Sequence, residues 1–167
     1  VLRCADVRFA GARPSAGAPV KQADIFYLLS TLSLFLASCA CGTAARAIDI
    51  AREYSKERYQ GGSMIDEHDA IRLQIGQNRS ALQAAADGVR ACAERFDPTD
   101  MKTMNCLQVK AAVSKATVNA CLDAIQIHGG YGYMRDYGIE KRFRDAATLS
   151  VLPLDSTRLL LIADALA

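Results

Sequence analysis

The sequence contains no tryptophan, and aromatic residues make up only 7% of its 167 residues. Proline is also scarce, with four in the chain and none between Gln22 and Tyr59, where Gly42 is the only glycine. Nothing in that stretch therefore interrupts a helix. Hydrophobic residues make up 51% of the chain, and Ala and Leu predominate. This composition favours helices, and the length suits one domain with a sizeable core.

The chain also lacks a strong charge of either sign. Its formal net charge is +2, and it has neither a basic block nor an aromatic platform, so we expect no nucleic-acid partner. The first residue is Val1, without an initiator methionine or a charged-then-apolar signal segment. We therefore expect the chain to be a piece of a longer protein.

The six cysteines form no CxxC pair. Most of them lie within apolar helical patterns, where cysteine behaves as a small hydrophobic residue. This arrangement predicts a reducing compartment and no metal site. The residues are Cys4, Cys39, Cys41, Cys92, Cys106 and Cys121.

The first 20 residues differ in pattern from the rest. The short segment Asp6-Val-Arg-Phe9 reads as extended, and two glycines and two prolines between Gly11 and Pro19 exclude a continuous helix. We interpret residues 1–20 as the end of a preceding domain with a linker, and residues 21–167 as a C-terminal helical bundle domain.

The stretch Ile25–Ala45 contains no charged residue over 21 positions, which is long enough to span a bilayer. Serines and threonines dilute its hydrophobicity, and the pattern continues without a break into the charged, amphipathic segment Arg46–Arg58. We therefore expect a helix buried on all sides in a bundle or oligomer, and no stable membrane insertion. A membrane span is the alternative.

The Gly61-Gly62 pair ends the first long helix, and two further long helices follow. One begins with an acidic first turn around Asp66 and ends before Pro98, and the next runs from about Thr99 to His128 with apolar residues at three- and four-residue spacing. Ile139–Ala147 and Leu154–Ala167 are candidates for the fourth partner, the latter with Asp155 or Ser156 as N-cap. The fold class expected is all-α: an antiparallel four-helix bundle of long helices with a short C-terminal helix.

A glycine-rich turn, Gly129-Gly-Tyr-Gly132, ends the third of these helices. No strand pattern precedes it, so it is neither a Rossmann nor a Walker loop. The glycines alone indicate a helix cap, while their bare backbone also leaves room for a polyphosphate.

Three segments carry a resemblance to a known family. The segments Tyr54-Ser-Lys-Glu-Arg-Tyr-Gln-Gly-Gly62, Gln126-Ile-His-Gly-Gly-Tyr-Gly-Tyr133 and Glu140-Lys-Arg-Phe-Arg-Asp-Ala146 follow one another in the order and with the spacing found in acyl-CoA dehydrogenases. In that family the corresponding patterns are Tyr-x-x-x-Arg-x-Gln-Phe-Gly, Gln-x-x-Gly-Gly-x-Gly-Tyr, and Arg-Asp-Ala. Ser114-Lys115 lies where the family often has a lysine, and Asp6–Phe9 is similar to the last strand of its middle β-domain. The chain thus resembles the C-terminal part of such an enzyme.

The resemblance implies an FAD-dependent oxidoreductase of fatty acid metabolism that acts on an acyl-CoA. Such enzymes are usually tetramers, with FAD between subunits and an electron-transfer flavoprotein as acceptor. We therefore expect self-association as a dimer or tetramer and a cytoplasmic location, or the mitochondrial matrix in a eukaryote. Carried over by motif, the FAD-binding residues are Arg58, Gln60, Gln126, Gly129, Gly130 and Thr157. Arg58 would hold the pyrophosphate with bidentate, permanently charged donors, and the Gln126 amide can point to the same ligand.

The two histidines lie close to these motifs, at positions 68 and 128. His128 occupies a variable position inside the glycine motif, where we expect it to form a local hydrogen bond rather than to titrate in catalysis. His68 is expected on the surface of a helix.

The catalytic part of the family signature is not found. Many members carry a catalytic Glu soon after Arg-Asp-Ala, but ungapped counting places Pro153 there. A two-residue slip makes Asp155 a candidate base, and an ordinary N-cap is its alternative role. Members with the base on the first long helix would have it near Leu32 and Ser33, where there is no carboxylate. The phenylalanine of Arg-x-Gln-Phe-Gly is replaced by Gly61.

Three functions therefore remain open. The first is an acyl-CoA dehydrogenase that uses Asp155 or a base from elsewhere. The second is a family member without its base, acting as a structural, FAD-completing subunit or in other flavin chemistry, similar to a nitroalkane oxidase or a flavin monooxygenase. The third is a helical membrane or scaffold protein that uses Ile25–Ala45 as a span.

Overall fold

The computed structural model describes residues 21–97 and 105–165. These residues form five α-helices: α1 (Gln22–Glu57), α2 (Asp69–Glu94), α3 (Asn105–His128), α4 (Ile139–Val151) and α5 (Ser156–Ala165). Short 3-10 turns, η1 (Ile65–Glu67), η3 (Gly129–Tyr133) and η4 (Arg135–Tyr137), connect them. The all-α prediction is confirmed. The predictions for residues 1–20, and for the start of the third helix before Asn105, lie outside the described residues.

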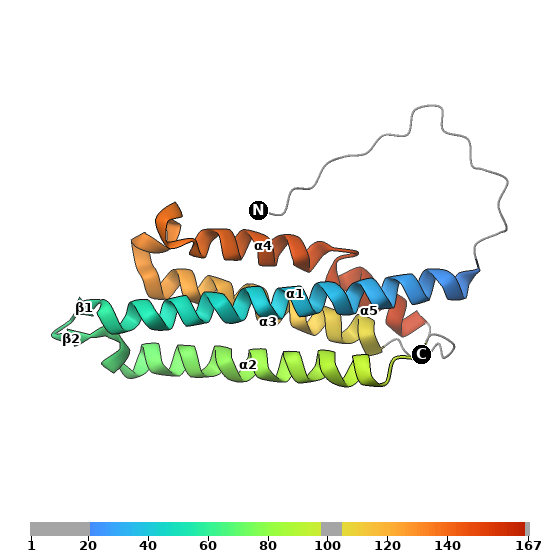
Figure 1. The fold of residues 1–167 in the computed structure, drawn as a ribbon, viewed down its shortest axis with the longest axis horizontal. Coiled ribbons are helices and arrows are strands. Elements are labelled where there is room, and N and C mark those ends of the chain that lie inside the picture. Colours follow the sequence, from blue (N-terminus) through green and yellow to red (C-terminus); the bar gives the residue numbers. More distant parts are fainter. Residues whose placement is uncertain (1–20, 98–104, 166–167) are drawn as a thin grey trace, which may run out of the picture.

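Four helices run lengthwise beside one another in alternating directions (Figure 1). Helices α1 and α3 pack together along the middle, and α2 and α4 lie on opposite sides of this pair, each contacting both helices. The short α5 packs on α3 at the end remote from the hairpin. This is the antiparallel four-helix bundle expected from the periodicity.

Small side chains form the buried stripe of α1. Ala37, Ala40, Ala44, Ala47 and Ala51 are each at most 1% exposed and recur at three- and four-residue spacing. A stripe of alanines lets the backbone of a neighbouring helix approach closely, since no long side chain separates the two helices. The main core cluster joins Ala44, Ala47 and Ala51 to apolar residues of α2, α3 and α4, and a second cluster joins Ala37 and Ala40 to other residues of the same three helices.

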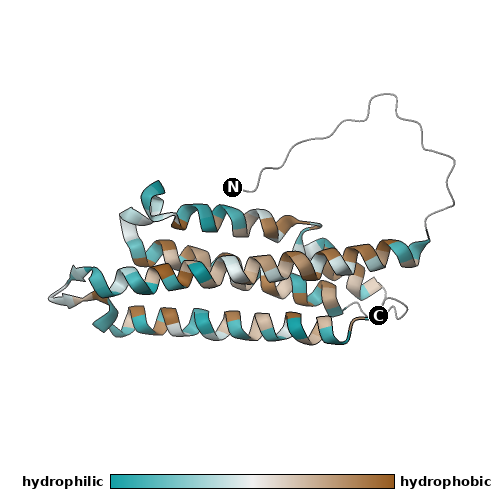
Figure 2. Cartoon of the chain, viewed as in Figure 1, coloured by the Kyte–Doolittle hydropathy of each residue, from teal (hydrophilic) through white to brown (hydrophobic). Residues whose placement is uncertain are grey.

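The first half of α1 is not buried on all sides by the bundle, and its burial in an oligomer stays a prediction. Leu28 and Phe35 are 65% and 63% exposed, because the neighbouring helices cover only the small-residue face. Figure 2 shows the apolar character concentrated in the half of α1 away from the hairpin. By length and composition alone, α1 and the stretch Ile139–Ala165 could cross a membrane, a property that core helices of soluble proteins share. The second stretch is broken between α4 and α5.

A small hairpin follows α1, where the sequence predicted only the end of a helix. Strands β1 (Tyr59–Gln60) and β2 (Ser63–Met64) pair antiparallel around Gly61-Gly62, whose φ angles are +68° and +94°. Positive φ at both central residues is the geometry of a tight hairpin turn, and glycine adopts it without strain. The acidic residues expected in the first turn of the second helix lie instead partly in η1, and α2 begins at Asp69.

The C-terminal helix begins where its N-cap was predicted. The Asp155 Oδ1 atom accepts a hydrogen bond from the Arg158 backbone N–H at 3.1 Å, three residues into α5. This confirms Asp155 as an N-cap.

Two of the cysteines on helices, Cys106 and Cys121, are buried, and burial raises the pKa of the Cys121 thiol to about 12. They act as small hydrophobic residues, as predicted; Cys4 lies outside the described residues.

Candidate functional site

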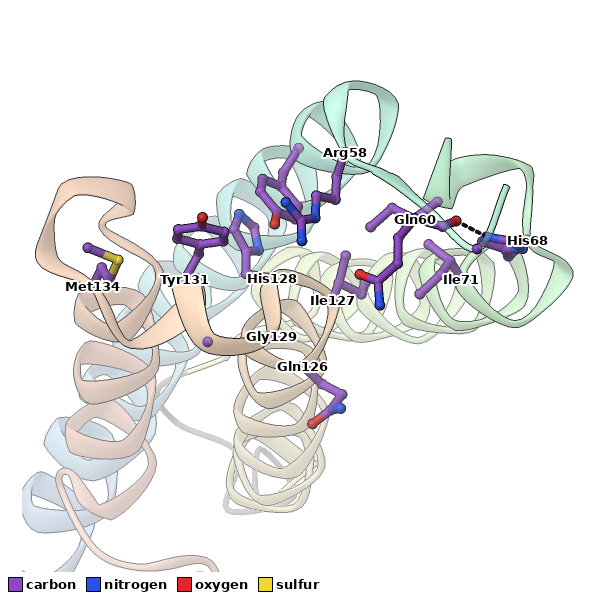
Figure 3. A pocket seen from close by; sticks show the side chains of 14 residues that line it. Arg58, Gln60, His68, Ile71, Gln126, Ile127, His128, Gly129, Tyr131 and Met134 are labelled. Carbon is purple, nitrogen blue, oxygen red and sulfur yellow. Dashed lines mark hydrogen bonds between the residues drawn. The ribbon is translucent and has the colours of Figure 1, made fainter. Parts of the chain in front are cut away.

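A cavity of about 710 Å³ opens at the hairpin end of the bundle (Figure 3). It lies between the C-terminal ends of α1 and α3, with the hairpin and the start of α2 on one side and the glycine turn on the other. Five residues predicted to bind FAD all line this one cavity, although they come from segments far apart in the sequence: Arg58, Gln60, Gln126, Gly129 and Gly130.

Arg58 supplies the positive charge of the cavity. It is the C-cap residue of α1, is solvent-exposed, and lies over the Tyr131 ring with its Cζ atom 5.7 Å from the ring centroid. Among the described residues no carboxylate lies within ion-pairing distance of Arg58, whereas Arg46, Arg72, Arg79, Arg90, Arg144 and Arg158 each form an ion pair. Its guanidinium donors are therefore available to an anion.

The glycine turn presents open backbone to the cavity. Gly129 has φ +58° and continues the chain from the end of α3 in the left-handed conformation, which confirms the helix-cap role. A Cβ atom added at Gly129 or Gly130 would meet no atom within 4 Å, so a ligand can approach the backbone there. Gly132 is different: its Cβ would lie 2.6 Å from the Ile125 carbonyl oxygen. This glycine is required by packing and not by a ligand.

The two glutamines of the motif lie differently. The Gln60 side chain extends toward Ile127 inside the cavity, whereas the Gln126 carboxamide points away from Arg58 and is exposed (Figure 3). Gln126 thus lines the cavity, but its amide does not face the same space as Arg58. Its position, three residues before Gly129, places it on the outer side of the last turn of α3.

An aromatic cluster borders the cavity beside Arg58. The Tyr54 and His128 rings stack with their centroids 4.3 Å apart and an interplanar angle of 19°. Tyr137 packs edge-on against both rings, and Tyr131 packs against Tyr54 and Tyr137. Burial raises the pKa of Tyr54, whereas Arg58 lowers it by a smaller amount. The phenol is therefore neutral and can act as a hydrogen-bond donor.

His128 forms the local hydrogen bond that was predicted for it. Its Nδ1 atom lies 2.8 Å from the Ala124 carbonyl oxygen, so Nδ1 carries the proton and donates. Burial lowers the pKa of the imidazole, which favours the neutral ring. The prediction that His68 lies on a helix is wrong, because His68 precedes α2. Its Nε2 atom lies 3.0 Å from the Gln60 carbonyl oxygen.

The other two predicted site residues do not join this cavity. Asp155 and Thr157 lie at the start of α5, near the opposite end of the bundle (Figure 1). Asp155 is already engaged as an N-cap and forms an ion pair with Arg158 at 3.3 Å. The sequence did not indicate that Tyr54, His68 and Tyr131 would line the cavity. Tyr54 precedes Arg58 by four residues, one helical turn, and this spacing could have indicated it.

Comparison with known proteins agrees with this site. Residues 29–152 match the sequence pattern described as "Acyl-CoA dehydrogenase, C-terminal domain". The chain belongs to the acyl-CoA dehydrogenase family. The family prediction is thereby confirmed, and the matched segment contains the whole cavity.

Individual members of the family align with most of this acyl-CoA dehydrogenase domain. An acyl-CoA dehydrogenase of Bacillus subtilis is 32% identical over 146 residues, covering 83% of this chain and 38% of the relative. The CarC subunit of the caffeyl-CoA reductase-Etf complex of Acetobacterium woodii is 35% identical over 118 residues, covering 71% of this chain and 31% of that subunit.

Solved structures show the same architecture. The structure of butyryl-CoA dehydrogenase from Megasphaera elsdenii superposes with a TM-score of 0.79 at 25% identity, over 84% of this chain and 37% of that enzyme. The acyl-CoA dehydrogenase domain described here thus spans somewhat more than a third of the length of such relatives.

Proposed function

We propose that this chain is the C-terminal domain of an FAD-dependent acyl-CoA dehydrogenase, and that it contributes FAD contacts across a subunit interface. One observation carries the proposal: Arg58, which has no carboxylate partner within residues 21–97 and 105–165, shares one cavity with the open backbone of Gly129 and Gly130. Permanently charged donors beside bare backbone suit a pyrophosphate group.

The residues present fit the ADP portion of FAD. Arg58 would pair with the pyrophosphate, Gly129 and Gly130 would allow it to approach, and Gln60 would offer an amide from the hairpin side. Bound FAD would supply hydride acceptance at the isoalloxazine ring. The residues of this domain would bind and orient the FAD, and they offer no carboxylate base there, since no described carboxylate lines the cavity.

The rest of the enzyme is required for catalysis. The chain spans little more than a third of its relatives, so the segments that enclose the isoalloxazine and the acyl chain are expected outside these 167 residues. An acyl-CoA substrate, a dimeric or tetrameric assembly, an electron-transfer flavoprotein as acceptor and a cytoplasmic or matrix location belong to the same proposal. The name of the CarC relative, which includes an Etf complex, supports the acceptor.

Binding of FAD to the chain tests the proposal directly. We expect weak binding without stoichiometric yellow protein, because the chain spans little more than a third of its relatives' length. We expect Arg58→Met to weaken this binding by about tenfold, as for loss of one charge-assisted contact. Arg90→Met is the matched control, since Arg90 is an exposed arginine on α2 that does not line the cavity. Equal binding by the Arg58 and Arg90 variants would contradict the proposed site.

A second candidate function is a family member without the usual catalytic base. The structure favours this over Asp155 as a base, because both carboxylate oxygens of Asp155 interact with Arg158, one with the backbone N–H and the other with the side chain. Pro153 cannot act as a base at all. Such a protein would complete an FAD site for a catalytic subunit or would serve other flavin chemistry.

The two candidates separate in the longer protein that contains this chain. Flavin reduction is followed with a panel of acyl-CoAs for the wild type and for Asp155→Asn, which keeps an N-cap side chain. Loss of reduction with retained FAD would identify Asp155 as the base. Reduction unchanged in Asp155→Asn would place the base elsewhere, and absence of reduction in the wild type would support the base-free candidate.

A further inference from the structure

The buried imidazole of His128 has one nitrogen without a partner in the part of the chain that the structure describes. His128 is only 2% exposed and lines the cavity. Its Nδ1 atom is occupied by the Ala124 carbonyl, but within the described residues the Nε2 atom has no hydrogen-bond partner and is shielded from solvent. A buried polar atom without a partner destabilises a fold, so packing alone does not account for a histidine here.

The protonation state defines what Nε2 can bind. Nδ1 must carry a hydrogen because a carbonyl oxygen accepts, and burial lowers the pKa of His128, so the ring is neutral. Nε2 then presents a lone pair and can only accept a hydrogen bond. The pyrophosphate of FAD is a fully ionised diester whose oxygens only accept hydrogen bonds, so it is not the partner of this atom.

We propose that His128 Nε2 accepts a hydrogen bond from a hydroxyl or amino group on the nucleoside part of the ligand in this cavity. This inference rests on the proposed function, in which the cavity holds the ADP portion of FAD. It divides the recognition between two residues: Arg58 selects the anionic pyrophosphate, and His128 selects a donor such as a ribose hydroxyl or the amino group of adenine. The ligand class is therefore a nucleoside diphosphate and not a simple anion.

The surroundings of the ring are consistent with this role. Tyr54 stacks on His128 and Tyr137 packs on its edge, so the imidazole is held in one orientation. Tyr131 lies beside His128 in Figure 3, is 42% exposed and belongs to the short η3 turn. A displacement of the Tyr131 ring would open the space next to His128 and give a planar base a ring on which to stack.

The experiment compares three probes on the full 167-residue chain: ADP, adenosine and inorganic pyrophosphate. His128→Phe keeps a flat ring against Tyr54 but removes the acceptor. Tyr137→Phe is the matched control, because it alters the same cluster without touching Nε2. Dissociation constants come from chemical-shift titrations, and the ¹⁵N resonance of His128 Nε2 is followed in the wild type.

We expect His128→Phe to weaken ADP and adenosine by about tenfold, the loss of one hydrogen bond of average strength, while pyrophosphate binding and the melting temperature do not fall. The Nε2 resonance should shift with adenosine and not with pyrophosphate. Equal weakening of binding for all three probes, or no weakening for any, would overturn the role of His128 and leave the proposed function of the cavity standing. Wild-type chain that binds neither pyrophosphate nor ADP would overturn the cavity's proposed function and this inference together.

Discussion

The ammonium group of Lys110 donates a hydrogen bond to the backbone carbonyl of Leu149, with Nζ and O separated by 2.9 Å. Lys110 on α3 is completely buried and also donates to the Ser114 hydroxyl at 2.6 Å. Leu149 lies in the last turn of α4, where carbonyl groups have no partner within the helix. Lys110 therefore caps α4 from the interior and ties α3 to the segment that leads to Pro153 and Asp155.

The titration of Lys110 should make stability depend on pH. Burial lowers the pKa of Lys110 from 10.5 to about 8, so between these values the unfolded chain binds more protons than the folded chain. Stability therefore rises as pH increases through this window, and the cost of burying the charge is fully present below it. In Lys110→Met this rise should be absent, and the difference is measured by urea unfolding at pH 7, 8, 9 and 10.

Lys115→Met is the control for this measurement, because Lys115 is exposed on the same helix. Its unfolding free energy should stay within about 0.5 kcal/mol of the wild type at each pH. Parallel pH curves for the wild type and Lys110→Met would contradict the proposed titration.

The example of Lys110 shows where prediction from sequence succeeds and where it fails. The absence of proline correctly predicted α1, and apolar stripes correctly predicted α2 and α3, because both are local properties of the sequence. The resemblance indicates a lysine at position 115, which is exposed, whereas Lys110 is buried. Its spacing, three residues after Leu107 and four before Ser114, placed it on the buried face, but composition alone suggests solvent for any lysine.

The candidate site was also predicted from the sequence only in part. Arg58, Gly129 and Gly130 were placed together through motifs in register, not through any local pattern. The stack of Tyr54 on His128 joins two helices whose contact depends on the whole bundle, so no local signal predicted it. Gly61-Gly62 predicts the end of a helix, whereas the structure has a hairpin there, because two adjacent glycines also suit a two-residue hairpin turn.

Gly132 and Gly130 should respond oppositely to alanine. A Cβ at Gly132 would lie 2.6 Å from the Ile125 carbonyl oxygen and 3.0 Å from its Cα, and neither backbone atom can move away cheaply. We expect Gly132→Ala to reduce the unfolding free energy by about 1–3 kcal/mol, as for overpacking of a well-packed site. Chemical denaturation measures this.

Gly130→Ala provides the matched comparison, since its Cβ would meet nothing within 4 Å. Its stability should stay within about 0.5 kcal/mol of the wild type, while pyrophosphate binding should weaken because the methyl group occupies open space in the cavity. Equal stability losses in the two variants would show that the turn is sensitive to any side chain and would contradict this assignment.

The contact between Asn78 and Asp123 should stabilise the packing of α2 on α3. Asn78 is buried, and its Nδ2 atom donates to Asp123 Oδ2 at 2.7 Å and to the Gln74 carbonyl at 2.9 Å. A double-mutant cycle with Asn78→Ala and Asp123→Ala should give a coupling energy of about 1–3 kcal/mol, the range for a hydrogen bond to a charged group.

The pair Gln83 and Asp87 on the exposed face of α2 is the control for this cycle, with hydrogen bonds of 3.0 and 3.1 Å. Its coupling should be at most about 0.5 kcal/mol, because exposed pairs four residues apart on one helix contribute little. A coupling for Asn78 and Asp123 no larger than this would mean that their hydrogen bond adds nothing to the helix contact.

Asp155 should contribute to stability as an N-cap whatever its role in chemistry. Removal of the side chain in Asp155→Ala leaves the Arg158 backbone N–H without its acceptor and should cost about 1 kcal/mol. Asp155→Asn should be nearly neutral, because asparagine caps a helix comparably. Thermal unfolding of both variants tests this, and equal destabilisation by Ala and Asn would assign the effect to the ion pair with Arg158.

The exposed apolar side of α1 should make the chain associate in solution. Leu28 and Phe35 are seven residues apart, hence on one face of the helix, and are 65% and 63% exposed. Leu32 lies between them and is 38% exposed, so large apolar side chains recur along this face of α1. Extended exposed apolar surface marks a site of association. We expect sedimentation analysis to give a mass above the 18.0 kDa of one chain. Leu28→Ser with Phe35→Ser should shift the chain toward the monomer.

Leu73→Ser is the control for this effect, because Leu73 is 62% exposed on α2, away from that face. It should leave the association unchanged, since a single exposed leucine is ordinary on a protein surface. The same measurement separates association from the membrane alternative. A chain that uses α1 as a span would require detergent, and the double variant Leu28→Ser with Phe35→Ser would not become a soluble monomer. In a chain that buries this face against protein, the same double variant would be soluble without detergent.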